Sequence, residues 1–249
     1  MLQNGHFVDF FPLRLKRNSC DKGLFLMKKI ISLVCLFVLA AALVSAQIMT
    51  AGDFFQSINE FYGTIKDFEA NVTIKDSKSV SAAKVSFKRP NLLRFDFSNP
   101  DTQVICFNAE TLTIYVPRTR AIMTQTVSAG GRSSGAGIAT PEGLSLMRRY
   151  YSISYETGQN AEPLEEGSSE MVVKLILVPK TSSEGYRRIR LSVNPETKLI
   201  RRVEGYAKSG ETFIFDFKNY VLNKGIPDTR FIYDPPSSAN SYDNFLYAE

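Results

Sequence analysis

Short runs in which hydrophobic and polar residues alternate fill most of the chain, and residues 87–117 show this pattern most clearly. Leu93, Phe95 and Phe97 occupy every second position, with polar or charged residues between most of them. Alternation with a period of two predicts a β-strand with one apolar and one polar face. Turns that contain proline and asparagine flank this strand and favour an antiparallel meander. The turns and the next two strands are expected at 88–91, 98–101, 104–107 and 112–116.

A different spacing, with apolar residues three and four positions apart, predicts an amphipathic helix over residues 50–62. Thr50 is a suitable N-cap, Asp53 lies in the capping-box position, and Gly63 follows the last turn. The apolar stripe of this helix needs a packing partner elsewhere in the chain. It consists of Phe54, Ile58 and Phe61, widened by Phe55 and Tyr62.

A second, shorter helix is expected to begin at Thr140. Pro141 and Glu142 follow it, and a threonine cap, a proline at the first position and an acid in the first turn are typical of helix starts. Leu144 and Met147 lie on one side of this helix, which therefore also has an apolar face.

The remaining alternating runs bring the total to about ten or eleven antiparallel strands. A sheet of that size curls. We therefore predict a mainly β (α+β) fold, an incomplete, strongly curved antiparallel β-barrel covered by a lid of two or three short α-helices. Such a fold contains a lined cavity, whereas an ordinary sandwich core explains the same composition and stays open as an alternative. The additional strands are expected at 68–74, 83–87, 122–127, 151–155, 171–178, 186–193, 199–206, 212–217 and 230–233.

The start of the chain predicts export. Residues 27–46 begin with Met-Lys-Lys, continue with an apolar run and end in small residues at Ala46, the pattern of a cleaved secretory signal peptide. We expect residues 1–26 to be an upstream extension from a start codon assigned too early, with a long functional leader as the alternative. A single domain is expected at 47–249, with a disordered polar tail at 237–249.

Without this leader, the chain loses most of its net charge of +5. Nucleic-acid-binding proteins normally have a strong basic excess, so nucleic acid is not an expected partner. The single histidine, His6, also lies in the leader, which excludes a Ser-His-Asp triad and almost every zinc site that uses histidine. Only Cys106 of the three cysteines remains, so no internal disulfide can form. No metal or cofactor is expected.

Carboxylate chemistry is the catalytic option that remains. Several glutamates gather in a loop rich in Gly, Ser and Pro, where solvated charge is the ordinary interpretation. Because two catalytic carboxylates need only meet in space, a secreted carboxylate-dependent hydrolase stays open as an alternative. A Gly-rich stretch at 129–137 lacks the closing Gly-Lys-Ser/Thr of a phosphate-binding loop and predicts a flexible loop. The loop glutamates are Glu162, Glu165, Glu166 and Glu170.

Three short motifs stand out by their order and spacing. They are KRPNLLRF at 88–95, QVICFNAETLTIYVP at 103–117 and FIYDPP at 231–236. Together they resemble the LolA family of periplasmic lipoprotein carriers, and the resemblance extends from about Phe54 to Pro236. It implies an incomplete β-barrel with a helical lid, which agrees with the fold predicted from the residue pattern.

The resemblance implies a chaperone rather than an enzyme. Members of the family shield the acyl chains of lipoproteins in an apolar cavity. They carry them from an inner-membrane ABC transporter to an outer-membrane receptor, or to the outer membrane itself. Each methylene exposed to water costs ~0.8 kcal/mol, so acyl chains need this shield. We therefore expect a periplasmic monomer with acylated lipoprotein as cargo. An envelope sensor or lipid carrier on the same fold is the alternative.

By position in the KRPN turn, Arg89 matches the arginine that hydrogen-bonds the lid in the closed state of the family. Its guanidinium suits carbonyl groups at helix ends, although a solvated arginine at a strand end explains the same residue. Leu93 stands where the best-studied branch has an aromatic residue important for transfer, so the transfer behaviour of this chain stays open. The expected cavity and lid lining, each member of which can also be plain core, is Phe54, Ile58, Phe61, Phe87, Leu93, Phe95, Leu144 and Met147.

Five arginines fall on adjacent predicted strands. A solvated outer surface balanced by nearby acids is the ordinary interpretation, and a docking patch for an acidic partner is the other. They are Arg187, Arg188, Arg190, Arg201 and Arg202.

Overall fold

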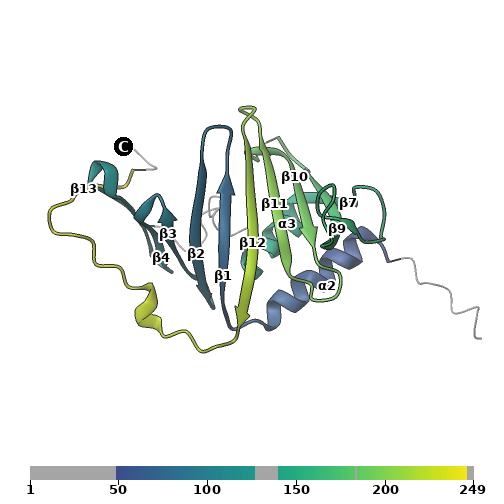
Figure 1. Cartoon of the computed structure of the whole chain (residues 1–249), viewed down its shortest axis with the longest axis horizontal. Helices are drawn as coiled ribbons and strands as arrows, with labels where there is room; N and C mark the ends of the chain where they lie inside the picture. Colours follow the sequence, from purple (N-terminus) through teal and green to yellow (C-terminus); the bar gives the residue numbers. More distant parts are fainter. Residues whose placement is uncertain (1–48, 127–139, 183, 246–249) are drawn as a thin grey trace, which may run out of the picture. The chain divides into compact units, whose positions relative to one another are not determined.

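A computed structural model describes residues 49–126, 140–182 and 184–245 (Figure 1). The chain divides into two units, Met1–Ile48 and Met49–Glu249, and the first lies wholly outside the described residues. The expected signal peptide, the upstream extension and the Gly-rich loop at 129–137 therefore also lie outside them. The helices are α2 (Ala51–Thr64) and α3 (Pro141–Tyr150), with short 3-10 helices η1 (Pro117–Thr119) and η2 (Asp228–Phe231). The strands are β1 (Asp67–Lys75), β2 (Val80–Lys88), β3 (Leu92–Asn99), β4 (Asp101–Asn108), β5 (Thr111–Val116), β6 (Ala121–Thr126), β7 (Tyr151–Tyr155), β8 (Glu162–Pro163), β9 (Met171–Pro179), β10 (Tyr186–Val193), β11 (Ile200–Ala207), β12 (Thr212–Leu222) and β13 (Asn240–Asp243).

These strands form one 13-stranded sheet in the order β13-β6-β5-β4-β3-β2-β1-β12-β11-β10-β9-β7, with β8 paired to β9. Every pair is antiparallel except β13 with β6. Strands β1 and β12 pair near the middle of the sheet and join the β2–β6 meander to the β7–β11 half. The predicted mainly β fold, an incomplete antiparallel barrel with a helical cover, is confirmed, but the sheet has 13 strands rather than the expected ten or eleven, and one of its pairs is parallel.

Both helices begin where their caps predict. Thr50 accepts a hydrogen bond from the backbone N–H of Asp53 at 3.1 Å, and Thr140 accepts one from Gly143 at 3.1 Å. Helix α2 runs through Gly63 to Thr64 instead of ending before the glycine, because the backbone of Ile65 closes the last turn onto the carbonyl of Tyr62. The two helices lie on the β7–β12 side of the sheet rather than beside β2–β4 (Figure 1).

One row of paired residues marks the inner face of the sheet, which is the face toward the helices. Ala70, Val85 and Phe95 are cross-strand neighbours on β1, β2 and β3, and all three belong to the core that also contains Phe55 and Ile58 of α2. Directly paired residues point to the same side of a sheet. The row therefore continues across the inner face of β4, β5 and β6 through Ile105, Ile114 and Met123.

The C-terminal region differs from the sequence-based expectation in two places. The strand expected at 230–233 is instead the end of η2 and an irregular segment on the outer face of β3. Its backbone carbonyls at Arg230 and Ile232 accept hydrogen bonds from the guanidinium of Arg94 rather than from a neighbouring strand. In addition, β13 lies within the tail predicted to be disordered. Its side chains are exposed, so it lacks the apolar alternation by which a strand is predicted.

The outer face of β1 carries a carboxylate whose ionisation stabilises the fold. Burial alone raises the pKa of Glu69, but hydrogen bonds and ion pairing with Lys224 and Lys84 outweigh it and hold the pKa below its usual 4.5. A lowered folded-state pKa contributes stability that is present above the unfolded-state pKa and is lost as the pH falls through the folded-state value.

We therefore expect Glu69→Gln to lower the free energy of unfolding by about 1 kcal/mol at neutral pH, because it removes a charged acceptor from two lysines. The difference from the unmodified chain should shrink as the pH falls below 4.5 and through the folded-state pKa, because the native carboxylate also becomes protonated there. Urea unfolding of both proteins at a series of pH values from neutral to acidic measures this difference in the free energy of unfolding. A difference that stays constant with pH would contradict the assigned role of the Glu69 charge.

Candidate functional site

The inner face becomes progressively less buried toward β6. In the row defined above, the exposed fraction is 1% at Ala70, 2% at Val85 and 7% at Phe95. The next three members, Ile105, Ile114 and Met123, are only half-buried. Burial therefore decreases with distance from the helices.

The neighbouring row shows the same gradient as far as β5, but its last member, Gln125 of β6, is polar and buried again. Phe87 and Leu93 are buried, whereas their next cross-strand partners, Phe107 and Leu112, are half-buried. None of the residues in the two rows is charged. We call the half-buried members of both rows the apolar strip, which consists of Ile105, Phe107, Leu112, Ile114 and Met123.

On the other half of the sheet, the helices cover the inner face closely. Phe55, Ile58 and Tyr62 of α2 are completely buried. The hydroxyl of Tyr62 accepts a hydrogen bond from the backbone N–H of Ile200 at 3.1 Å, and the hydroxyl of Tyr220 donates to the carbonyl of Ile200 at 3.0 Å. Burial raises the pKa of Tyr62 to about 12, so it remains a neutral hydrogen-bonding group at physiological pH. These contacts fix the C-terminal half of α2 on β11.

Arg89 joins the β2–β3 turn to the end of α2. Its guanidinium donates a hydrogen bond to the carbonyl of Gly63, one of the last carbonyls of the helix. Its backbone N–H donates to the carbonyl of Lys66 at 2.9 Å. The side chain remains exposed to solvent, so the contact lies at the surface of the protein.

The structure places the expected lining residues in two environments. Phe87, Leu93 and Phe95 lie in the inner-face rows next to the apolar strip. Four others are buried at the helix–sheet interface, and Phe61 is half-buried at its margin. The buried four are Phe54, Ile58, Leu144 and Met147.

The apolar strip itself was not part of the residue set expected from the sequence. Alternation within 104–107 and 112–116 contains the signal, since Ile105, Phe107, Leu112 and Ile114 share one face if the two runs pair as a hairpin. The missing information was which face of the hairpin joins the core.

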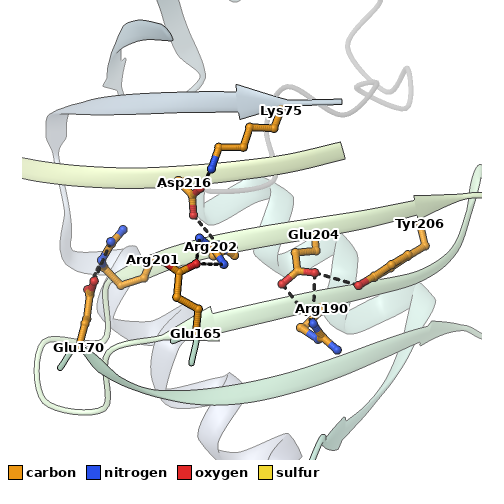
Figure 2. A network of polar contacts seen from close by, with 9 residues as sticks. All are labelled: Lys75, Glu165, Glu170, Arg190, Arg201, Arg202, Glu204, Tyr206 and Asp216. Carbon is orange, nitrogen blue, oxygen red and sulfur yellow. Dashed lines mark hydrogen bonds and ion pairs between the residues drawn. The ribbon is translucent and has the colours of Figure 1, made fainter. Parts of the chain in front are cut away.

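The outer face of the β7–β12 half carries a network of ion pairs (Figure 2). Arg202 pairs with Asp216 and Glu165, and Asp216 also contacts Lys75 at 3.5 Å. Arg190 pairs with Glu204, whose carboxylate accepts a hydrogen bond from Tyr206 at 2.8 Å.

These pairs decide between the two interpretations of the arginine-rich strands. Arg201 pairs with Glu170, and Lys174 lies 3.5 Å from Glu162, so loop acids neutralise much of the basic charge on the sheet. Arg188 stacks over the ring of Tyr206 at 4.3 Å, and Arg187 is exposed. Acids therefore balance Arg190, Arg201 and Arg202, as the ordinary interpretation expects, but Arg201 is buried, with 8% of its surface exposed, rather than solvated. The same pairs occupy three of the four glutamates that a carboxylate-dependent hydrolase could use.

Two further observations bear on the chemistry of the described residues. A cleft of about 410 Å³ lies between the β1–β2 and β11–β12 turns, and most of the residues that line it are polar or charged, with Ile214 as the one hydrophobic side chain among them. Within 49–126, 140–182 and 184–245, no group of His, Cys, Asp and Glu side chains is arranged to hold a metal ion. No helix in these same ranges has both the length and the apolar character needed to cross a membrane.

Comparison with known proteins gives related results by sequence and by structure. The family model described as outer membrane lipoprotein carrier protein LolA matches residues 64–234. A protein of Actinobacillus succinogenes, named outer-membrane lipoprotein carrier protein, is 25% identical over 218 residues, which are 86% of this chain and 95% of the relative. A protein of the same name from Pseudomonas paraeruginosa is 24% identical over 157 residues, covering 63% of this chain and 68% of the relative. The crystal structure of an uncharacterized conserved protein from Thermus thermophilus is 13% identical, with a TM-score of 0.50 and coverage of 76% and 98%, which supports the fold alone.

Proposed function

Because the chain belongs to the LolA family of outer membrane lipoprotein carrier proteins, we propose that it binds the acyl chains of lipoproteins on the apolar strip and shields them from water. The apolar strip is the observation that carries this proposal. It consists of half-buried hydrophobic side chains in two neighbouring rows of the inner face, none of them charged, next to a fully buried core and bordered on β6 by Gln125.

The energetics favour such a site. Shielding an acyl chain of more than ten methylenes from water is worth on the order of 10 kcal/mol. A site for this purpose needs adaptable apolar contacts and few fixed hydrogen bonds, so that the cargo can also leave. Leucine, isoleucine, methionine and phenylalanine provide those contacts in the apolar strip, and methionine is especially adaptable in shape.

The proposed cycle takes place in the periplasm. The mature chain accepts acylated lipoprotein from an inner-membrane ABC transporter and delivers it to an outer-membrane receptor or to the outer membrane. It works as a monomeric carrier with one cargo molecule, performs no chemical reaction and uses no cofactor. Direction comes from the partners, since the transporter supplies energy for loading and a tighter-binding acceptor removes the cargo.

A binding titration tests the proposal. The mature chain is mixed with a fluorescent diacylglyceryl-cysteine, which carries the lipid of a lipoprotein without its polypeptide. Saturable binding at one molecule per chain is expected, with competition by unlabelled acylated lipoprotein and none by a headgroup analogue that lacks the acyl chains. Absence of saturable binding would contradict the proposal.

A gating role for Arg89 gives a separate prediction. Helix α2 is held on the sheet by buried contacts and, at its exposed end, by the hydrogen bond from Arg89 to Gly63. We propose that this bond favours the closed position of the helix and breaks when cargo is exchanged. Arg89→Leu should leave the free energy of unfolding within about 1 kcal/mol, because the residue is exposed, but should favour an open α2.

Because closure of α2 competes with bound cargo, losing the bond that favours closure should slow delivery of cargo from Arg89→Leu to acceptor vesicles, measured by transfer of a fluorescent lipopeptide. Arg89→Lys is the matched control, since it keeps the charge but loses the planar fork of donors and should restore delivery only in part. Delivery by Arg89→Leu at the unmodified rate would contradict the gating role.

A further inference from the structure

Strand β13 covers the edge of the sheet next to the apolar strip, and it is held there by little besides backbone hydrogen bonds. Its four residues pair in parallel with residues 121–124 of β6, and all four side chains are exposed. At its two ends, the backbone N–H of Asn240 donates a hydrogen bond to the carbonyl of Arg120 and that of Asn244 to the carbonyl of Thr124, each at 2.8 Å. One side-chain bond, from the hydroxyl of Thr124 to the carboxylate of Asp243, is added to them.

The segment before β13 is attached quite differently. Phe231 is buried, its carbonyl accepts a hydrogen bond from the thiol of Cys106, and Arg230 pairs with Asp96. After this anchor, Ile232 is 68% exposed. The tail therefore has a firm attachment on the outer face of β3 and β4 and a weak one at the β6 edge. Strand β13 can leave that edge without disturbing the core.

The edge beneath β13 borders the proposed acyl-binding site. Met123 of the apolar strip belongs to β6, and its direct partner on β13 is Tyr242, which is 55% exposed. Helices cover the inner face over the β7–β12 half, whereas the apolar strip on β4, β5 and β6 is only half-buried, with the buried Gln125 beside it on β6. A polypeptide joined to acyl chains on the apolar strip is too large to follow them inside, so it leaves on the β6 side.

We propose that the edge of β6 is a strand-addition site, with β13 as its displaceable occupant and the extended polypeptide next to the acyl group of the cargo as its ligand. This inference rests on the proposed function. A strand edge recognises a peptide through main-chain hydrogen bonds, which suits a carrier of cargo with many sequences. Once the acyl chains are bound, the attached peptide is at high effective concentration at this edge, whereas a free peptide is not.

Two proline variants of the full mature chain test the proposal. The bonds from Asn240 and Asn244 show that even-numbered residues of β13 donate to β6. Tyr242→Pro therefore removes a donor from the ladder and weakens β13, whereas Ser241→Pro, its control, changes an N–H that points away. In the unmodified chain, the free energy needed to displace β13 lowers the apparent affinity for a ligand that pairs with β6. Tyr242→Pro should therefore bind a diacylglyceryl-cysteinyl hexapeptide about three- to tenfold more tightly than the unmodified chain. Ser241→Pro should show little gain.

Two further probes identify what causes the gain. The first probe is the same lipopeptide methylated at its peptide nitrogens, which cannot donate hydrogen bonds to β6 and should therefore bind Tyr242→Pro no more tightly than the unmodified chain. The second probe is diacylglyceryl-cysteine without a peptide, which should bind all three proteins with equal affinity. Amide hydrogen exchange should show that the lipopeptide deprotects residues 240–244 while β6 stays protected. Equal affinities for the lipopeptide and unchanged exchange at 240–244 would overturn the strand-addition site. If diacylglyceryl-cysteine itself does not bind, the proposed function fails.

Discussion

Replacing Ile114 by aspartate is expected to weaken binding of diacylglyceryl-cysteine by about 30-fold or more. Ile114 lies in the middle of the apolar strip, with Ile105 and Met123 as its direct cross-strand partners. An acyl chain at this position would press an aspartate carboxylate against hydrocarbon, where it has no hydrogen-bond partner. A penalty of only ~2 kcal/mol corresponds to about 30-fold in the dissociation constant. Fluorescence titration measures the change.

Thr111→Asp provides the matched control for this variant. Thr111 is on the same strand as Ile114 but on the opposite face of the sheet, and both residues are half-buried. The added charge is therefore the same, but it lies on the other side of the sheet. Thr111→Asp should bind the probe within about twofold of the unmodified chain. Similar affinities for the two variants would show that the acyl chains do not lie on the inner face.

Replacing Phe55 by alanine is expected to lower the free energy of unfolding by about 3–5 kcal/mol. Phe55 has no exposed surface, and it belongs to the core that joins α2 to the inner face of the sheet. Its removal leaves a large cavity that the rigid sheet cannot close. Urea unfolding followed by circular dichroism measures the loss, and a fall in the melting temperature should accompany it.

Phe61→Ala is the control for this prediction, because it makes the same change on the same helix at a half-buried position. Phe61→Ala should lower the free energy of unfolding by clearly less, about 1–2 kcal/mol, since less buried surface is lost from the core. If the two variants are equally unstable, then α2 does not pack on the sheet in the orientation described.

The parts of the fold that follow from neighbouring residues could be predicted from the sequence. The alternation around Phe95, the turns beside it and the threonine caps of both helices are local signals, and the structure contains the corresponding strands and helix starts. The pairing of β1 with β12 could not be predicted in this way, because the two strands come from distant parts of the chain and their register depends on packing. The tail on the outer face depends on contacts such as Arg94 with the carbonyl of Arg230, which leave no periodic pattern.

The candidate site shows the same division. The sequence resemblance pointed to Arg89, and the structure contains a hydrogen bond from it to a helix-end carbonyl. The hydrophobic stripe of α2 was visible, but periodicity alone did not reveal that Phe55 and Tyr62 are fully buried while Phe61 stays at the margin. That distinction depends on how the helix is rotated against the sheet, which only the assembled core determines.

Native mass spectrometry of the chain, purified from the cells that produce it, tests the central claim most directly. Lipid extraction and peptide identification of the bound material complete the measurement. The proposed carrier function predicts a complex of one chain with one acylated lipoprotein, which is lost from Ile114→Asp and retained by Thr111→Asp. A chain that is empty, or that carries only free phospholipid, would contradict it.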